Sequence, residues 1–134
     1  MLFRSPFADD SFDAVFAYHT ISHTDAYLAE QIIREISRIL RPGAEAFLTL
    51  CSKSSPNFSE PSYPRIDAGT VLKTKDGPEY GVAHFYVDLE DILTLFSEFE
   101  LIHISEVTDL WYDGERHDSR HFHLLIQKSV QANG

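Results

Sequence analysis

The sequence predicts an α/β protein whose first half is a strand, a helix and a second strand. Residues 12–19 and 44–51 form two apolar runs with the β-branched and aromatic content of buried strands. Between them, residues 26–41 carry apolar side chains at the spacing of one buried helix face. The chain has 134 residues, of which 43% are hydrophobic and 24% charged. It can bury one core, so we predict a single domain over residues 1–134.

The two predicted strands should be parallel neighbours. A turn containing Pro6, Asp9 and Asp10 precedes the first strand, because these residues favour a tight change of direction. The first run is almost continuously apolar, which is typical of a strand buried on both faces of a sheet. Since a helix separates the two strands, a right-handed crossover should connect them, and together they predict a βαβ unit.

The helix should begin at Ala26 and end at Arg41. Ser22 or Thr24 can cap its first turn, with Asp25 near the positive end of the helix dipole. A basic last turn, a proline and a glycine mark its end: Arg38, Arg41, Pro42 and Gly43. Its buried face should consist of Leu28, Ala29, Ile32, Ile33, Ile36, Ile39 and Leu40.

Residues 51–64 follow the second strand and are rich in serine and proline, without periodicity. We expect a mobile loop there, because the segment offers few apolar anchors. Ligands of open α/β sheets bind beside the carboxyl ends of the strands. The length of the loop favours a role as a lid or as a substrate-facing segment over that of a plain connection.

The second half predicts more strands and a short helix. Residues 70–73 and 82–86 flank Asp76-Gly77-Pro78, which indicates a small irregular hairpin that could cover the site. Residues 88–96 predict a helix with Asp88 as its cap. Residues 99–108 and 122–128 predict two antiparallel strands, joined by a turn around Asp113-Gly114-Glu115.

Composition and charge exclude several classes of function. No apolar run is long enough for a transmembrane helix, and the first four residues do not resemble a signal peptide, so we expect a cytoplasmic protein without membrane contact. The net charge of −10 disfavours nucleic acid as a partner. Cys51 lies in a predicted buried strand and is better explained as a small core residue than as a nucleophile.

Two segments have a recognisable pattern: residues 5–15, SPFADDSFDAV, before the first predicted strand, and residues 34–43, REISRILRPG, at the end of the predicted helix. They resemble class I S-adenosylmethionine-dependent methyltransferases of the type 11 kind. In that family the first segment leads into the fourth strand, and the second is the end of the next helix. Ser5 replaces the usual leucine and Ala44 the usual second glycine. The resemblance implies a partial Rossmann-like fold, with strands in the spatial order fourth, fifth, seventh and sixth.

The glycine-rich cofactor turn of that family has no counterpart in these 134 residues, whose 6 glycines form no G-x-G-x-x-G cluster. The resemblance therefore implies the C-terminal half of a methyltransferase domain, truncated and weak or inactive alone. Its cofactor would be S-adenosylmethionine, which we expect this chain alone to bind weakly or not at all. The methyl acceptor would be a small molecule or a protein. The alternative is a non-catalytic module, derived from a methyltransferase, that dimerises or binds a partner.

The resemblance also implies candidate site residues. His19 follows the first strand, where the family places residues that face the methyl donor or acceptor, and it could act as a general base. The remaining rim of the cofactor pocket would consist of Leu2, Phe3, Phe7, Tyr18 and His19. The acceptor would be lined by His23, His84 and Tyr86. For His19, His23 and Tyr18, a structural role remains the alternative.

The histidines near the C-terminal end raise the possibility of a metal site, but the sequence does not lead us to predict one. His121 and His123 share a strand face, with His117 and Asp118 nearby, so three imidazoles could hold zinc. However, their spacing matches no established zinc signature.

The first strand also predicts self-association. Residues 12–20 contain neither lysine nor proline to protect an exposed strand edge. We therefore expect a homodimer with a two-fold axis. In it, this strand edge or the adjacent helices of one protomer would contact the same elements of the other.

Overall fold

The computed structural model describes residues 4–75 and 77–130. Its elements, in chain order, are β1 (Phe12–Ala17), α1 (Ala26–Ile39), β2 (Leu40–Ser52), the 3₁₀ turn η1 (Pro56–Ser59), β3 (Arg65–Asp67), β4 (Thr70–Leu72), β5 (Ala83–Val87), α2 (Leu89–Leu95), β6 (Phe99–Tyr112) and β7 (Glu115–Lys128). Neither helix of the described ranges is long and apolar enough to cross a membrane.

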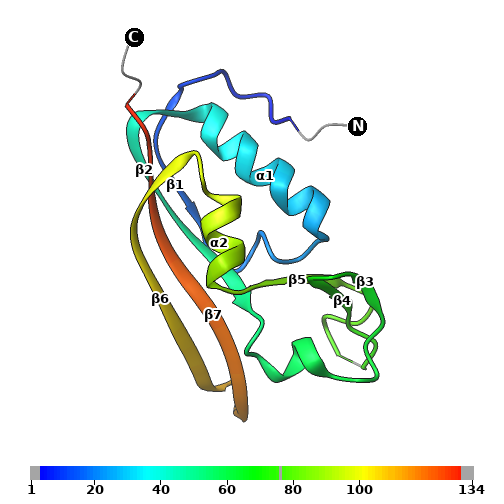
Figure 1. Ribbon diagram of the computed structural model, residues 1–134. Coiled ribbons are helices and arrows are strands. Elements are labelled where there is room, and N and C mark those ends of the chain that lie inside the picture. Colours follow the sequence, from blue (N-terminus) through cyan, green and yellow to red (C-terminus); the bar gives the residue numbers. More distant parts are fainter. Residues whose placement is uncertain (1–3, 76, 131–134) are drawn as a thin grey trace.

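The sheet is organised around β2, which pairs in parallel with β1 and antiparallel with β7 (Figure 1). β6 lies outside β7, so the order β1, β2, β7, β6 is the predicted order of fourth, fifth, seventh and sixth strands. The βαβ unit is confirmed as well. At its carboxyl end, β2 also pairs in parallel with β5, through Cys51 and Ser52.

The predicted small hairpin is present, since β4 pairs antiparallel with β5. A further short strand that the sequence analysis did not predict, β3, pairs with β4. These three strands form a lobe that projects from the carboxyl end of β2, on the same side as η1 (Figure 1).

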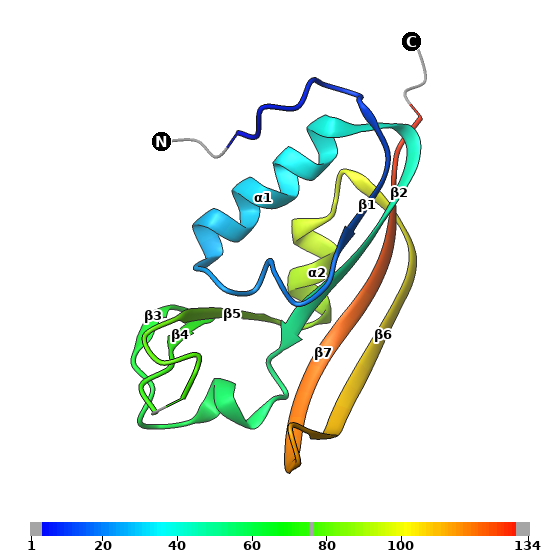
Figure 2. The ribbon, with the colours of Figure 1, turned by 180° about the vertical axis from the view of Figure 1, so that it is seen from behind.

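The core lies between the sheet and the two helices, which cover the same face of the sheet (Figures 1 and 2). Ile33 and Ile36 from α1 and Ile92 and Phe96 from the α2 region are buried in it. From the sheet, alternate residues of β2 and β7 point into this core: Ala46, Leu48, Leu50, Leu124 and Ile126.

The boundaries of α1 differ from the prediction. Asp25 is the N-cap, because its side chain accepts a hydrogen bond of 2.8 Å from the Leu28 N–H. Ser22 instead accepts a hydrogen bond from the Cys51 N–H, which fixes the start of the helix connection against β2. The helix ends at Ile39, because Leu40 is extended and already belongs to β2.

The prediction that the first strand is buried on both faces was wrong. Val15 and Ala17 pack toward α1. Phe16, on the opposite face, is 72% exposed, because neither helix covers that side of the sheet. Among the described residues no strand pairs with the other edge of β1.

β6 and β7 form a hairpin much longer than predicted. A two-residue turn joins them, in which Asp113 and Gly114 have φ of 54° and 72°, as a type I′ turn requires. The pairing register shifts between Asp109 and Trp111, because two residues of β7 lie opposite one of β6. The distal half of the hairpin extends past the helices toward the same end as the β3–β5 lobe (Figure 2).

Candidate functional site

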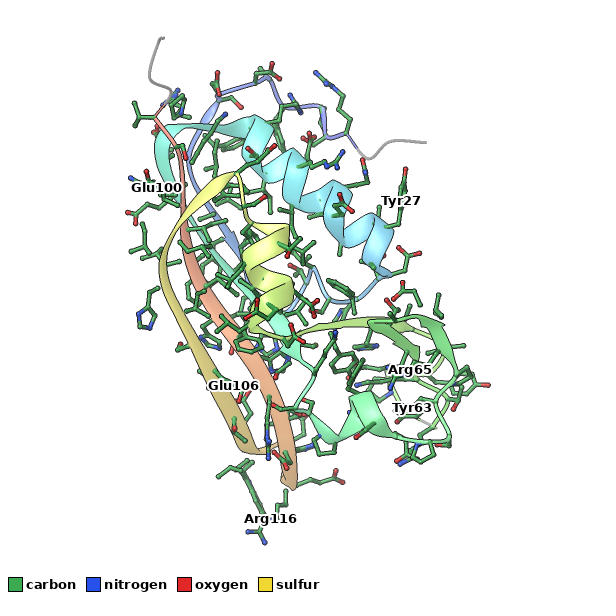
Figure 3. All side chains as sticks on the ribbon, viewed as in Figure 1. Tyr27, Tyr63, Arg65, Glu100, Glu106 and Arg116 are labelled. Carbon is green, nitrogen blue, oxygen red and sulfur yellow. The ribbon has the colours of Figure 1, made fainter. Side chains whose placement is uncertain are left out.

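A cleft of about 1270 Å³ lies at the carboxyl ends of β1 and β2. One wall is the distal half of the hairpin. The other consists of residues 55–57 at η1 and of lobe residues, namely Lys73, Pro78, Glu79, His84 and Tyr86. Figure 3 shows Arg116 at the tip of the hairpin and Tyr63 and Arg65 on the lobe across from it. The cleft is therefore at the sheet edge where open α/β sheets bind their ligands.

Five of the residues singled out in the sequence line this cleft together: Tyr18, His19, His23, His84 and Tyr86. Phe7 does not, since it lines a separate groove of about 260 Å³ between α1 and β1. Leu2 and Phe3 lie outside the described residues. The structure thus brings the acceptor-lining candidates together with Tyr18 and His19 of the predicted cofactor rim, and it separates Phe7 from them.

His19 has a left-handed backbone, with φ of 54°, directly after β1. This conformation is uncommon for a residue other than glycine and is frequent at functional sites. The His19 N–H donates a hydrogen bond of 2.7 Å to Thr49 Oγ1, which holds the turn against β2. The imidazole lies between the rings of Tyr18 and His121, with centroid distances of 4.0 and 4.1 Å. Burial lowers the pKa of His19 below its usual value.

His121 comes from β7, where it pairs with Cys51 of β2 and Val107 of β6. Its Nδ1 is 3.9 Å from Asp109 Oδ2 on the neighbouring strand. Burial, and then the adjacent His19, lower the pKa of His121 to about 4. Both imidazoles are therefore neutral near pH 7. One ligand atom each from His19, Asp109 and His121 lies within 4.8 Å of the other two.

The other wall carries a second polar group. His84 is only 2% exposed, and its ring nitrogens face the Val82 carbonyl oxygen and the Glu79 carboxylate. Burial and the nearby Lys73 lower the pKa of His84. In the neutral imidazole one of these two nitrogens carries the proton and donates it, to the Val82 carbonyl oxygen or to the Glu79 carboxylate. His23 approaches the same carboxylate at 3.8 Å.

Cys51 and Tyr86 are buried below the cleft and do not have the properties of reactive groups. Burial raises the pKa of the Cys51 thiol and that of the Tyr86 phenol. Since the thiolate is the nucleophilic form, the structure supports the core role expected for Cys51.

The segment after β2 is packed more firmly than expected. Ser55 accepts a hydrogen bond of 2.8 Å from the Arg120 N–H and donates one of 3.0 Å to the Arg120 carbonyl oxygen. Ser52 and Ser54 both donate to Glu106 of β6. The premise of few anchors was therefore wrong. Serine hydroxyls tie the segment to the hairpin, and Tyr63 and Phe58 anchor it in a cluster with Val71 and Tyr86.

The three imidazoles considered for zinc are not assembled. His117 stacks on Tyr112 at a centroid distance of 3.6 Å near the hairpin tip. His123 contacts the rings of Phe47 and Tyr18. Asp109, which the sequence analysis missed, lies 3.9 Å from His121 Nδ1 and belongs to a possible ligand group with His121 and His19. The strand register could have suggested Asp109, but the bulge beside it shifts the pairing by one residue.

Comparisons with known proteins give the same family as the sequence motifs. Residues 2–48 match the family model described as a methyltransferase domain. Sterol methyltransferase-like 1 of Botryococcus braunii is 47% identical over 53 residues, which are 40% of this chain and 13% of that protein. Sterol methyltransferase-like 3 of the same organism is 43% identical over 54 residues, 40% of this chain and 13% of that protein.

Solved structures are similar over almost the whole chain. A SAM-dependent methyltransferase from Methanosarcina mazei matches with a TM-score of 0.71 and 19% identity, over 95% of this chain and 64% of that one. The 1,6-didemethyltoxoflavin-N1-methyltransferase of Burkholderia thailandensis, solved with S-adenosylhomocysteine, matches with a TM-score of 0.63 and 10% identity, over 91% of this chain and 46% of that one.

The chain has the fold of class I S-adenosylmethionine-dependent methyltransferases, and the resemblance found in its sequence is confirmed. The family model covers residues 2–48, while the similarity of the remainder is one of fold. The chain spans 13% of the length of the curated relatives and 64% or less of the two solved chains named above.

Proposed function

We propose that the chain supplies the acceptor side of an S-adenosylmethionine-dependent methyl transfer to a small molecule. The observation that carries this proposal is the convergence of Tyr18, His19, His23 and His84 on one cleft. The cleft begins at the end of β1, within the residues that match the methyltransferase family. Its volume of about 1270 Å³ fits a small molecule, while the net charge of −10 disfavours nucleic acid.

Methyl transfer from a sulfonium needs positioning more than acid or base chemistry. Holding donor and acceptor in a reactive geometry can lower the free-energy barrier by about 7–11 kcal/mol. The rings of Tyr18 and His19 and the hairpin residues around Trp111 would form the walls that orient the acceptor. This role for the cleft requires no nucleophile of the protein, in keeping with the buried thiol of Cys51.

The 134-residue chain by itself should bind S-adenosylmethionine weakly. In related sheets the phosphate or ribose ligands are fixed by a glycine-rich turn and an acidic residue, and this sequence contains no such glycine cluster. Isothermal titration calorimetry tests the proposal. We expect a dissociation constant in the millimolar range, whereas saturable binding tighter than about 10 μM would contradict it.

We propose, as a second function, that the chain associates with a copy of itself through β1. The support is the edge of β1, which pairs with no strand in the part of the chain that the structure describes, and the neighbouring Phe16, which is 72% exposed. Two such edges can pair antiparallel across a two-fold axis, so that each satisfies the backbone groups of the other. Phe16→Lys is the better probe than Val15→Lys, because Val15 packs against α1.

Light scattering at tens of micromolar tests the association. A dimer that Phe16→Lys converts to a monomer supports it. A wild-type monomer of 15.3 kDa rejects it.

A further inference from the structure

Two buried imidazole nitrogens on one wall of the cleft have no hydrogen-bond partner. Among the described residues, only three buried side-chain nitrogen or oxygen atoms have none, and His19 Nε2 and His121 Nδ1 are two of them. Buried polar atoms are almost always paired, and an unpaired one is costly. A single partner that accepts a lone pair from each of these adjacent nitrogens would satisfy both.

We propose that His19, His121 and Asp109 bind one divalent transition-metal ion. The third ligand is the Asp109 carboxylate, whose Oδ2 is 3.9 Å from His121 Nδ1. Each of the three residues offers one ligand atom, and all three atoms lie within 4.8 Å of one another. A tetrahedral ion at about 2.0–2.1 Å from each would place them about 3.4 Å apart, so each pair of ligand atoms needs to close by at most about 1.4 Å.

The elements that carry the three ligands are well fixed. His19 is held in its left-handed turn by Thr49 of β2. His121 and Asp109 are on the antiparallel pair β7 and β6, next to the bulge that brings Asp109 diagonally across from His121. A site built on paired strands changes little when the ion leaves, so the ligands are already close together without it.

The ligand set selects the kind of metal. Two imidazoles and one carboxylate suit zinc, iron, cobalt or nickel, whereas magnesium and calcium prefer oxygen ligands. Three protein ligands leave at least one coordination position open, as in catalytic zinc sites. That position faces the cleft, because all three residues line it.

The second group of possible ligands, His23, Glu79 and His84, is a weaker candidate. Its carboxylate already contacts Lys73 at 3.4 Å and faces Nε2 of His84. The other nitrogen of His84 faces the Val82 carbonyl oxygen. A metal ion there would have to displace the Lys73 ammonium group, whereas His19 Nε2 and His121 Nδ1 have no hydrogen bond that metal binding would break.

The inferred ion changes the role of His19 and narrows the class of acceptor. His19 is then a ligand through Nε2, and not the general base suggested by its position in the sequence. The open coordination position of the ion would bind an oxygen or sulfur atom of the methyl acceptor. This step rests on the proposed function. The site itself does not depend on that function, since its ion can be measured without methyl donor or acceptor.

The experiment is a titration of the metal-free 134-residue chain with cobalt(II), followed by visible absorption, and with zinc in competition. We expect one ion per chain at micromolar affinity and a ligand-field spectrum of low coordination number. Magnesium and calcium should produce no competition. Asp109→Asn and His121→Gln should each weaken binding by at least tenfold.

His117→Gln is the matched control, because it removes a histidine of the same hairpin that stacks on Tyr112 outside the cluster. It should bind as the wild type does. Asp109 is 40% exposed by its side chain, so Asp109→Asn should keep the fold, which circular dichroism checks.

Three results would overturn the proposal. The first is a metal-free chain that takes up no cobalt at micromolar concentration, which would leave a water as the partner of the two nitrogens. The second is unchanged binding in both Asp109→Asn and His121→Gln. The third is binding that His84→Gln abolishes while the two cluster variants retain it.

Discussion

Replacing Glu35 by glutamine should destabilise the fold, because this buried carboxylate connects α1 to the segment before β1. Glu35 accepts hydrogen bonds of 2.6 and 2.9 Å from Arg38 and a further one from the Ser5 N–H. Arg38 in turn donates a hydrogen bond of 2.7 Å to the Asp9 carboxylate. This network holds residues 5–10, which belong to the segment that matches the methyltransferase family.

The size of the expected loss of stability depends on how well Arg38 remains paired after Glu35→Gln. Removing one member of a fully buried ion pair costs about 3–5 kcal/mol. In the variant Asp9 still pairs with Arg38, and the side chain of Asp9 is 67% exposed. We therefore expect a smaller loss of about 2 kcal/mol in the free energy of unfolding. For a chain of this size, that corresponds to a fall in Tm of roughly 6–10 °C.

The dependence on pH has a defined sign. The hydrogen bonds from Arg38 and then Ser5 lower the pKa of Glu35 from 4.5 to about 2. A carboxyl group with a lowered pKa contributes stability above its unfolded pKa and loses it as the pH falls through the folded one. The difference between wild type and Glu35→Gln should therefore be constant above about pH 5 and shrink toward pH 2.

Thermal unfolding by circular dichroism measures both effects. Glu30→Gln is the matched control, because Glu30 forms an exposed i, i+4 pair with Arg34 on the same helix. It should change the free energy of unfolding by less than about 0.5 kcal/mol. If the two variants lose the same stability, or if the Glu35 effect grows as the pH falls, the reasoning is refuted.

Three further predictions concern the hairpin and the segment beside it. The Ser55 amide should be protected in hydrogen exchange, because it donates 2.9 Å to the Ser52 carbonyl oxygen, and exchange as fast as in a free peptide would contradict this. Gly114→Ala should cost about 1–2 kcal/mol in chemical denaturation, because φ is 72°, while Gly114→Asn should cost less. His121→Phe in chelator should raise the free energy of unfolding by about 1 kcal/mol, since it removes an unpartnered buried nitrogen, and a lower Tm would contradict that.

Local sequence patterns predicted much of the fold. The spacing of apolar residues identified α1, and Asp88 was correctly predicted as the cap of α2. The Asp113-Gly114 pair located the hairpin turn, because both positions need positive φ. The strand order followed from the family resemblance and could not have come from periodicity, which says nothing of spatial neighbours.

The errors have a common physical cause, which is that burial depends on neighbours far along the chain. Phe16 reads as a core residue, yet neither helix covers its face of the sheet. The pattern of the segment after β2 indicates few anchors because serines lack apolar surface, but Ser55 bonds to Arg120, 65 residues away. Asp109 became a site candidate only through the bulge next to it, which no local pattern indicated.

The measurement that tests the central claim most directly is an NMR titration of the isotope-labelled chain with S-adenosylhomocysteine up to millimolar concentration. If the cleft is the site of methyl transfer, amide shifts should change weakly and progressively at Tyr18, His19 and His84, with the Phe7 groove unaffected. Shifts confined to that groove, or none anywhere in the chain, would contradict the assignment of the cleft.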